Sequence, residues 1–262
     1  MKTAQEYQKR LQRHLDELKW LYCELYPGRE DMFTQLCEQM EAWYQERPES
    51  EKKLDREREQ EPAWYSRQDM LGMMLYIDAF AGNLKGVKKK LPYLEACNVN
   101  YLHLMPFLDT PKGKSDGGYA VADYRKVQPA LGTMEELASL CSACHEKKMS
   151  VCMDFVMNHT SEDHEWAKRA LAGEKEYQDR YFFYDTPDIP QEFEKTVPQV
   201  FPTTAPGNFT WRDECKKYVM TSFYPYQWDL NYSNPVVFNE MVYNMLLSLI
   251  HISEPTRLGM IS

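Results

Sequence analysis

The sequence predicts an α/β protein in which an all-helical domain precedes the first part of a (β/α)8 barrel, also called a TIM barrel. Three observations predict this fold. Apolar residues recur at three- and four-residue spacing in the front of the chain. Short apolar runs then alternate with helical patterns, and long connections follow the second and third of these runs. The 262 residues suffice for one large α/β domain or two smaller ones.

Residues 1–65 are predicted to form the helical domain. An apolar stripe over residues 3–27 predicts a first helix, which the proline–glycine pair at its end should stop. A second stripe predicts a helix over residues 32–44. The charged stretch 45–62 predicts a solvated helix face or a linker, and by itself it indicates no functional site.

Three apolar runs predict strands that are buried on both faces, namely residues 70–80, 101–107 and 149–157. A helical pattern over residues 84–95 separates the first two, and Thr133 is predicted to cap the helix before the third. Alternation of strands and helices predicts right-handed crossovers and a parallel sheet. Both a barrel and a doubly wound sheet begin in this way.

The long connections favour the barrel. Barrel enzymes build their sites from insertions at the C-terminal ends of strands, and residues 108–132 and 158–234 stand at such ends. No glycine-rich phosphate-binding motif follows a predicted strand, which weakens the nucleotide-binding alternative. We therefore expect residues 66–246 to form an incomplete barrel of three βα units, with a small inserted domain at about 160–230 after the third strand.

Composition narrows the classes of partner. The net charge of −9 argues against nucleic acid, which needs a basic face, and no apolar run is long enough to span a membrane. The polar N-terminus does not resemble a secretory signal. The seven scattered cysteines are therefore expected to be reduced thiols in a cytoplasmic protein. The haem-attachment pattern at residues 141–145 is assigned to a helix instead.

The first polar motif is Asp116-Gly-Gly-Tyr119, followed by Ala-Val-Ala-Asp-Tyr-Arg. Two glycines allow a tight turn, so that a carboxylate and a phenol three residues apart can face one pocket. Taken alone, the motif is more often a turn at the surface than a site.

The second motif, Asp154-Phe-Val-Met-Asn158-His159, leaves the third predicted strand. Alternation along a strand places Asp154 in the barrel interior and brings Asn158 and His159 to its mouth. A buried, hydrogen-bonded aspartate and an asparagine helix cap remain alternatives. His159 has no second ligand at helical spacing, which argues against a metal site.

The third motif is Phe223-Tyr-Pro-Tyr-Gln227-Trp-Asp-Leu-Asn-Tyr-Ser-Asn234-Pro235. It is rich in the amide, acid and aromatic groups that are typical of sugar-binding loops. The alternative interpretation is a helix N-terminus, with Asn234 as the cap and Pro235 at the first helical position. We expect that interpretation to hold for these two residues in either case.

Together, the three motifs resemble the α-amylase superfamily, glycoside hydrolase family thirteen, and are most like amylosucrase. Residues 154–159 match the DxxxNH region of that family. DGGYAVADYR and QWDLNYSNP follow the amylosucrase form at Ala120 and Trp228, where α-glucosidases and trehalose synthases usually differ. The resemblance extends to about Leu246, and an all-helical front domain is also typical of amylosucrases.

The resemblance implies a glucose pocket. Tyr119 should stack on the glucosyl ring, Asp116 should bind its far edge, and His159 should bind its hydroxymethyl group. Phe223 and Gln227 should line the same pocket.

Two further residues are implied to support the pocket. Asp154 should act from the barrel interior and Asn158 should orient its loop. In many relatives the asparagine also binds calcium, which is not favoured here, so no cofactor or metal is expected.

The implied activity is retaining α-glucosyl transfer from sucrose to an α-1,4-glucan. Sucrose hydrolase, sucrose phosphorylase and another α-glucosidase are alternatives, and a non-catalytic carbohydrate-binding relative is an alternative of another class. The reaction needs two carboxylates about 5–5.5 Å apart. No Asp or Glu of the chain matches either one, so we expect no catalytic residue here and an inactive fragment.

The end of the chain is expected to have another origin. Residues 247–257 read LSLIHISEPTR, which resembles the translation of a transposase adaptor used in preparing DNA sequencing libraries. We therefore expect residues 247–262 to be an artefact derived from the adaptor.

Overall fold

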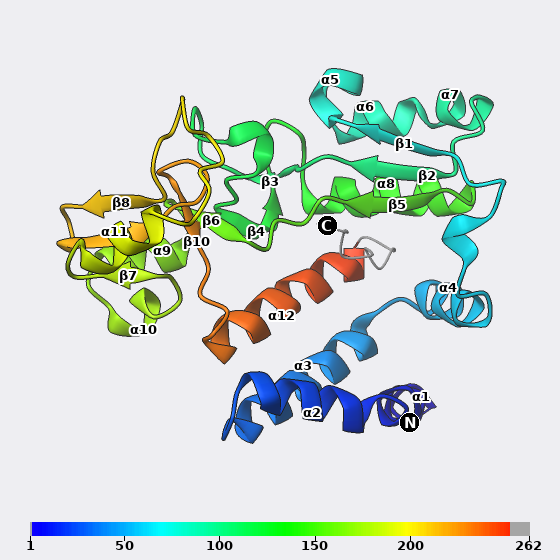
Figure 1. Cartoon of the computed structure of the whole chain (residues 1–262). Coiled ribbons are helices and arrows are strands. Elements are labelled where there is room, and N and C mark those ends of the chain that lie inside the picture. The colour runs from blue at the N-terminus through cyan, green and yellow to red at the C-terminus, as the bar shows by residue number, and fades with distance from the viewer. Residues whose placement is uncertain (1, 252–262) are drawn as a thin grey trace. The chain divides into compact units, whose positions relative to one another are not determined.

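The computed structural model describes residues 2–251, and residues 252–262 lie outside the described part. The chain divides into two compact units. Of the described residues, the first unit holds 2–107, 125–155 and 242–251, and the second holds 108–124 and 156–241. Figure 1 shows the helices and strands of the chain, coloured from blue at the N-terminus through green and yellow to red.

The front of the first unit is helical, as predicted. Its helices are α1 (Lys2–Gln12), α2 (Leu15–Leu25), α3 (Glu30–Glu46) and α4 (Glu49–Gln60). The predicted first helix is in fact two helices, because the chain breaks at Arg13 and His14. The charged stretch is a helix instead of a linker, and it is only partly solvated, since Glu51 and Lys52 are buried.

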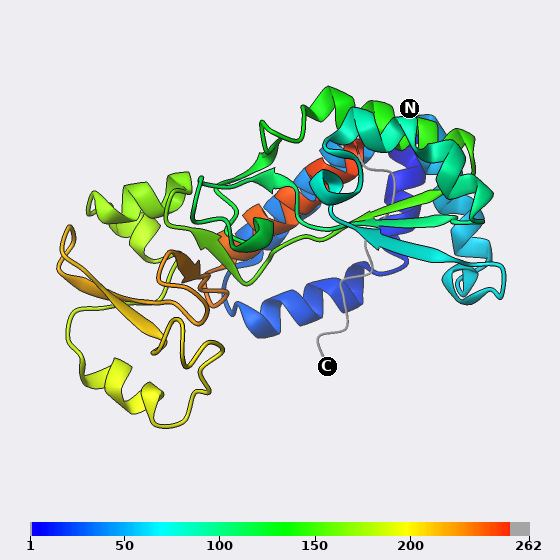
Figure 2. The ribbon, with the colours of Figure 1, turned by 90° about the horizontal axis from the view of Figure 1, so that it is seen from above.

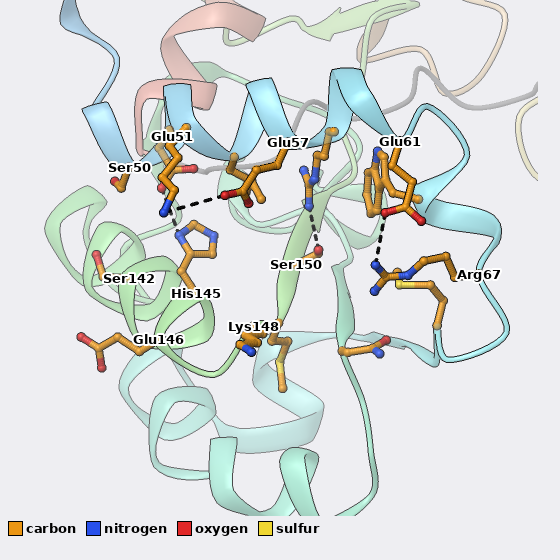
Figure 3. Close-up of a pocket in the computed structure, with 17 residues that line it drawn as sticks. Ser50, Glu51, Glu57, Glu61, Arg67, Ser142, His145, Glu146, Lys148 and Ser150 are labelled. Carbon is orange, nitrogen blue, oxygen red and sulfur yellow. Dashed lines mark hydrogen bonds and ion pairs between the residues drawn. The ribbon is translucent and has the colours of Figure 1, made fainter.

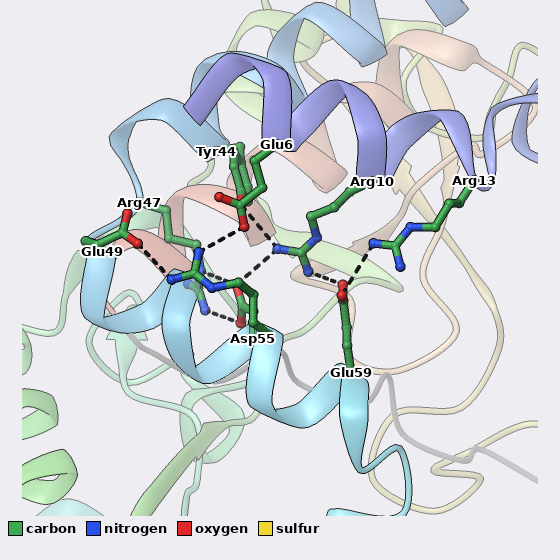
Figure 4. A network of polar contacts seen from close by, with 9 residues as sticks. Glu6, Arg10, Arg13, Tyr44, Arg47, Glu49, Asp55 and Glu59 are labelled. Atoms are coloured by element: carbon green, nitrogen blue, oxygen red, sulfur yellow. Dashed lines mark hydrogen bonds and ion pairs between the residues drawn. The ribbon is translucent and has the colours of Figure 1, made fainter. Parts of the chain in front are cut away.

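A polar network joins the front helices to α4 (Figure 4). The Arg47 guanidinium donates to both carboxylate oxygens of Asp55, each at 2.9 Å, and the Arg47 side chain is only 1% exposed. Glu59 accepts from Arg10 at 2.6 Å and from Arg13 at 3.3 Å. The charges of this stretch therefore hold helices together instead of only facing water.

Three short strands form the predicted parallel sheet, with the order β1 (Gly72–Leu75), β2 (Tyr101–Leu104), β5 (Ser150–Met153). Their ends are in register, with Leu104 opposite both Leu75 and Met153. All of β5 is buried. Burial of β1 on both faces was a wrong prediction, because Met74 is 66% exposed and the strand pairs with β2 alone among the described residues.

The helices between these strands cover one face of the sheet. They are α5 (Ile77–Ala81), α6 (Leu84–Lys89), α7 (Leu91–Ala96) and α8 (Met134–Glu146). Figure 2 shows α6, α7 and α8 on the same side of the strands. The predicted helix 84–95 breaks at Lys90, two residues before a proline. Thr133 accepts from the Glu136 amide at 3.3 Å, which confirms the predicted cap.

The second unit contains short elements and small sheets. Its first elements are β3 (Leu108–Asp109), the 3-10 turn η2 (Asp116–Gly118), β4 (Asp123–Val127), which runs into the first unit, and β6 (His159–Ser161). They are followed by α9 (Glu165–Leu171), α10 (Lys175–Gln178), β7 (Phe183–Tyr184), α11 (Asp188–Glu194), β8 (Phe209–Arg212), β9 (Lys217–Met220) and β10 (Gln227–Asp229). Antiparallel pairing joins β7, β9 and β8 in that order and pairs β10 with β6.

Helix α12 (Pro235–His251) follows β10. The Val236 amide donates to the Asn234 side chain at 3.0 Å, which agrees with the predicted cap at this helix start. The first residues of the expected adaptor segment, 247–251, continue α12, and the rest of that segment lies outside the described residues. None of the helices that the structure describes has the length and apolar character needed to cross a membrane.

Candidate active site

The short ladder of β6 and β10 has one polar face. The strands are antiparallel, with His159 opposite Asp229 and Ser161 opposite Gln227. Because side chains alternate along a strand, these four residues share one face of the ladder. All four are buried, so the face carries polar groups that need partners.

The opposite face of the ladder is an aromatic core. Trp228 and Thr160 point to it by the same alternation, and both are fully buried. The Trp228 ring meets Tyr181 and Phe183 edge-on, each with centroids 5.5 Å apart. The Thr160 and Tyr181 hydroxyls are 2.8 Å apart. This packing holds the ladder on one side, so that the polar side chains on its other side are held in fixed positions.

The Gln227 amide joins two of the predicted sugar-binding residues. Its Nε2 donates to Asp116 Oδ2 at 3.0 Å and lies 3.1 Å from His159 Nε2. Its Oε1 accepts from the Tyr224 amide at 2.9 Å. Gln227 is completely buried, so this side chain is held in one orientation. The second unit therefore brings Asp116, His159 and Gln227 together.

The His159 imidazole is held in its neutral form. Burial lowers its pKa below the usual 6.5, against the nearby charge of Asp229, which acts to raise it. In the tautomer with the proton on Nδ1, Nε2 accepts from Gln227. In the other tautomer, Nε2 donates to the Tyr119 carbonyl oxygen, 3.2 Å away. The Nε2 atom of His159 can thus act either as a hydrogen-bond donor or as an acceptor.

A tight turn positions Asp116. Asp116, Gly117 and Gly118 all have positive φ angles, of 49°, 66° and 102°. Glycine adopts this region without strain, which explains the two glycines of the motif. The Asp-Gly-Gly segment therefore forms a turn, which was the alternative interpretation of the motif. The same turn also places the Asp116 carboxylate beside Gln227.

Aromatic rings lie beside this cluster. The Phe223 ring packs against the His159 ring, with centroids 4.9 Å apart. Tyr119 follows the turn and is half-buried, and its carbonyl oxygen faces the imidazole. The five residues predicted to bind the sugar thus lie in the same unit, linked by contacts between neighbours.

Asp229 is a buried residue of the site that the sequence motifs alone did not indicate. Its Oδ1 accepts from Asn158 Nδ2 at 2.9 Å, and its Oδ2 accepts from the Ser222 amide at 2.6 Å. Asp229 is 6% exposed. Its carboxylate therefore connects β10 to Asn158 and to the Ser222 backbone inside the unit. Asp229 stands two positions after Gln227. Side chains at this spacing lie on the same face of a strand, so the spacing could have indicated that Asp229 belongs to the site.

Tyr124 anchors the segment that leads to His159. Its hydroxyl lies 2.9 Å from the Val156 carbonyl oxygen and 3.1 Å from that of His159, to which it can donate. Complete burial raises the pKa of this phenol well above 10, so it stays a hydrogen-bond donor. The tyrosine of the first motif therefore fixes the backbone of the second.

Asp154 is the one predicted site residue that lies outside the second unit. It follows β5 and belongs to the first unit, whereas the other predicted residues belong to the second. It is half-buried, and its amide donates to the Leu104 carbonyl at 3.0 Å. Its supporting role stays a prediction.

A separate cleft of about 800 Å³ lies in the first unit, beside α4, α8 and the start of β5 (Figure 3). Its lining includes Glu51 and His145, whose carboxylate oxygen and Nδ1 are 3.1 Å apart, and Arg58, which donates to Ser150 at 3.0 Å. None of the predicted site residues lines it. It is therefore distinct from the cluster around Gln227.

The chemistry of the cluster suits a neutral polyol. Over the described residues, no group of three His, Cys, Asp or Glu side chains is placed to hold a metal ion. A half-buried carboxylate, a buried amide, a neutral imidazole and an aromatic ring offer fixed donors, acceptors and an apolar face. Such sites bind small molecules through a few placed polar groups within apolar walls.

A family model described as the alpha amylase catalytic domain matches residues 39–252. A trehalose synthase from Pimelobacter sp. (strain R48) is 36% identical over 162 residues, which are 62% of this chain and 27% of the relative. An alpha-glucosidase from Apis mellifera is 36% identical over 165 residues, 61% of this chain and 28% of the relative. The chain thus spans less than a third of the length of these relatives.

Solved structures show the same likeness. A crystal structure of a MutB mutant in complex with the substrate sucrose has a TM-score of 0.62 and 27% identity, covering 72% of this chain and 34% of that one. An isomaltulose synthase mutant from Erwinia rhapontici NX5, in complex with D-glucose, has a TM-score of 0.62 and 26% identity, covering 70% and 33%.

Proposed function

The chain belongs to the alpha-amylase catalytic domain family of enzymes, and on that premise we propose that it supplies the glucosyl-binding part of a retaining α-glucosyl transferase. The observation that carries this proposal is the buried Gln227 amide, whose nitrogen lies within hydrogen-bond distance of both Asp116 and His159. In this assignment, Asp116 and His159 bind hydroxyl groups of the glucosyl ring. Tyr119 and Phe223 provide its apolar walls.

We propose sucrose as the donor and an α-1,4-glucan as the acceptor. A carboxylate attacks the anomeric carbon while a carboxylic acid protonates the leaving oxygen, which releases fructose. A glucan hydroxyl then displaces the enzyme carboxylate, and its proton returns to the acid–base group. The Ala120 and Trp228 forms of the motifs support this choice, as does the sucrose complex of one structural neighbour.

Other members of the family favour other donors. The trehalose synthase and alpha-glucosidase similarities support transfer or hydrolysis of a different α-glucoside as the second candidate. Asn158 is proposed to orient its loop and Asp154 to act as a support, with no cofactor. The protein is proposed to act in the cytoplasm.

The substrate is tested with the complete gene product, offered sucrose, trehalose and maltose separately. Fructose release from sucrose, together with growth of an added glucan, is the expected result. Activity on trehalose or maltose but not on sucrose would contradict the proposed donor while retaining the family chemistry. The 262-residue chain by itself is expected to release neither glucose nor fructose.

A further inference from the structure

A carboxylate in the second unit, that of Glu162, binds two cations from different segments. Glu162 directly follows β6. One of its oxygens pairs with the Lys114 ammonium, and the other accepts from the Arg212 guanidinium at 2.6 Å. The Glu162 and Arg212 side chains are only 15% and 16% exposed, so this ion pair is largely shielded from water. Glu162 therefore joins the end of β6 to a loop and to the end of β8.

The ion pair with Lys114 reaches the turn that positions Asp116. Lys114 stands two positions before Asp116, and residues 112–114 are exposed. An exposed segment gains little stability from packing, so its contacts with other elements decide how firmly it is held. The bond from Lys114 to Glu162 is such a contact, and it restrains the chain just before the turn.

The segment before Gln227 is held from the same place. The Glu162 amide donates to the carbonyl oxygen of Tyr226, which directly precedes Gln227, at 2.8 Å. Arg212, the second partner of Glu162, donates to the Pro225 carbonyl oxygen at 2.6 Å. Glu162 and its partner thus fix the backbone that leads into β10.

The two held segments meet in one hydrogen bond of the proposed pocket. Gln227 donates to the half-buried Asp116 carboxylate at 3.0 Å, and this bond depends on the position of both segments. Within the described residues, the Glu162 carboxylate bonds to neither of them. Its effect on the pocket must therefore act through Lys114 and Arg212.

We propose that Glu162 is a positioning residue of the glucosyl pocket, which holds the Asp116 turn against Gln227 through its ion pair with Lys114. This inference rests on the proposed function, because the ligand of the pocket is the glucosyl ring. Without the ion pair the turn would occupy several positions, and only the fraction with Asp116 in place would bind the sugar. Because the sugar is neutral, salt would weaken its binding by screening this ion pair of the protein.

The test titrates the 262-residue chain with methyl α-D-glucopyranoside by NMR. Lys114→Met should weaken the affinity about threefold to fivefold, as for one lost exposed ion pair, with the urea midpoint unchanged. Lys114→Arg keeps the charge and should retain the affinity. Lys168→Met removes the neighbouring exposed pair with Asp163 and is the matched control, which should change neither quantity. Glu162→Gln removes both of its ion pairs and should lose at least as much affinity as Lys114→Met.

Two further measurements distinguish positioning from general stability. Raising the salt concentration to about 1 M should weaken sugar binding by the original chain but not by Lys114→Met. The Ala120 amide donates to the Ser115 carbonyl oxygen at 3.0 Å inside the turn. Its hydrogen exchange should become faster in Lys114→Met and stay unchanged in Lys168→Met.

Each other result is decisive. Unchanged sugar affinity or unchanged Ala120 exchange in Lys114→Met overturns the inference, and so does an equal loss of affinity in Lys114→Arg. If Glu162→Gln loses affinity and stability together while Lys114→Met behaves like the original chain, Glu162 has only a structural role, which also overturns the inference. If the unsubstituted chain fails to bind methyl glucoside, the proposed function is contradicted, and Ala120 exchange still decides whether the ion pair holds the turn.

Discussion

The side-chain amide of Gln227 lies 3.0 Å from the Asp116 carboxylate, although 111 positions separate the two residues in the chain. The same amide nitrogen lies 3.1 Å from the His159 ring. One buried side chain therefore links the first, second and third polar motifs of the sequence. Its position follows from the pairing of β10 with β6, which presents Gln227 and His159 on one face.

Replacing Gln227 with leucine should weaken sugar binding. The change removes the donor that Asp116 accepts from and leaves the carboxylate and the imidazole without this partner. Methyl glucoside affinity is expected to fall about tenfold or more, and stability by about 1–3 kcal/mol. Saturation-transfer NMR and urea unfolding measure the two effects. Gln191→Leu, on an exposed face of α11, should alter neither, and an equal effect there would refute the assignment.

Asp229→Asn should destabilise the second unit. One of its two acceptor oxygens becomes a donor, so that the bond from Asn158 or from the Ser222 amide is lost at a buried position. We expect a loss of about 1–3 kcal/mol in the free energy of unfolding. Asp213→Asn, at a side chain that is 81% exposed, is the control and should be nearly neutral. Equal denaturation midpoints for the two variants would show that the hydrogen bonds of Asp229 do not stabilise the second unit.

His159 should make stability depend on pH below neutrality. Its pKa in the folded chain lies below 6.5, so between these two values the unfolded chain binds a proton that the folded chain does not. Its stabilising contribution is therefore complete above about pH 6.5 and is lost as the pH falls through the folded pKa.

Urea unfolding at a series of pH values measures this contribution. His159→Gln should flatten the decline in stability below pH 6.5, whereas His14→Gln, at an exposed position, should leave it unchanged. An identical pH profile for the original chain and His159→Gln would contradict the buried, neutral imidazole.

Asp55→Ala should strongly destabilise the front helices. The change leaves the nearly buried Arg47 guanidinium without its carboxylate, and breaking such a pair costs about 3–5 kcal/mol. Glu57→Ala removes an exposed partner of Lys53 on the same helix and should cost less than about 1 kcal/mol. Thermal or urea unfolding compares the two, and similar costs would argue against the network in Figure 4.

Much of the fold could be predicted because it depends on local patterns. Apolar runs predicted the parallel sheet of β1, β2 and β5, and Thr133 marked a helix start. Element ends were less accurate. Residues 70–80 are a strand of four residues followed by a helix, because periodicity alone does not distinguish a short strand from a buried helix turn.

The site was only partly predictable. The motifs named the residues, but the antiparallel pairing of β6 with β10 was not predicted, and this pairing brings His159 beside Gln227. The importance of Asp229 depends on bonds to Asn158 and to the Ser222 backbone, which neither composition nor spacing encodes. The burial of Arg47 likewise depends on packing between helices, so the charge run alone predicted a solvated surface.

The central claim is that the cluster of Asp116, His159 and Gln227 is a glucosyl pocket. It is tested most directly by saturation-transfer NMR of the 262-residue chain with methyl α-D-glucopyranoside and with methyl α-D-galactopyranoside, which differ only at one hydroxyl. We expect transfer to the glucoside, a much weaker signal for the galactoside, and loss of the glucoside signal in Asp116→Ala. Equal signals for both sugars, or a glucoside signal that survives in Asp116→Ala, would contradict it.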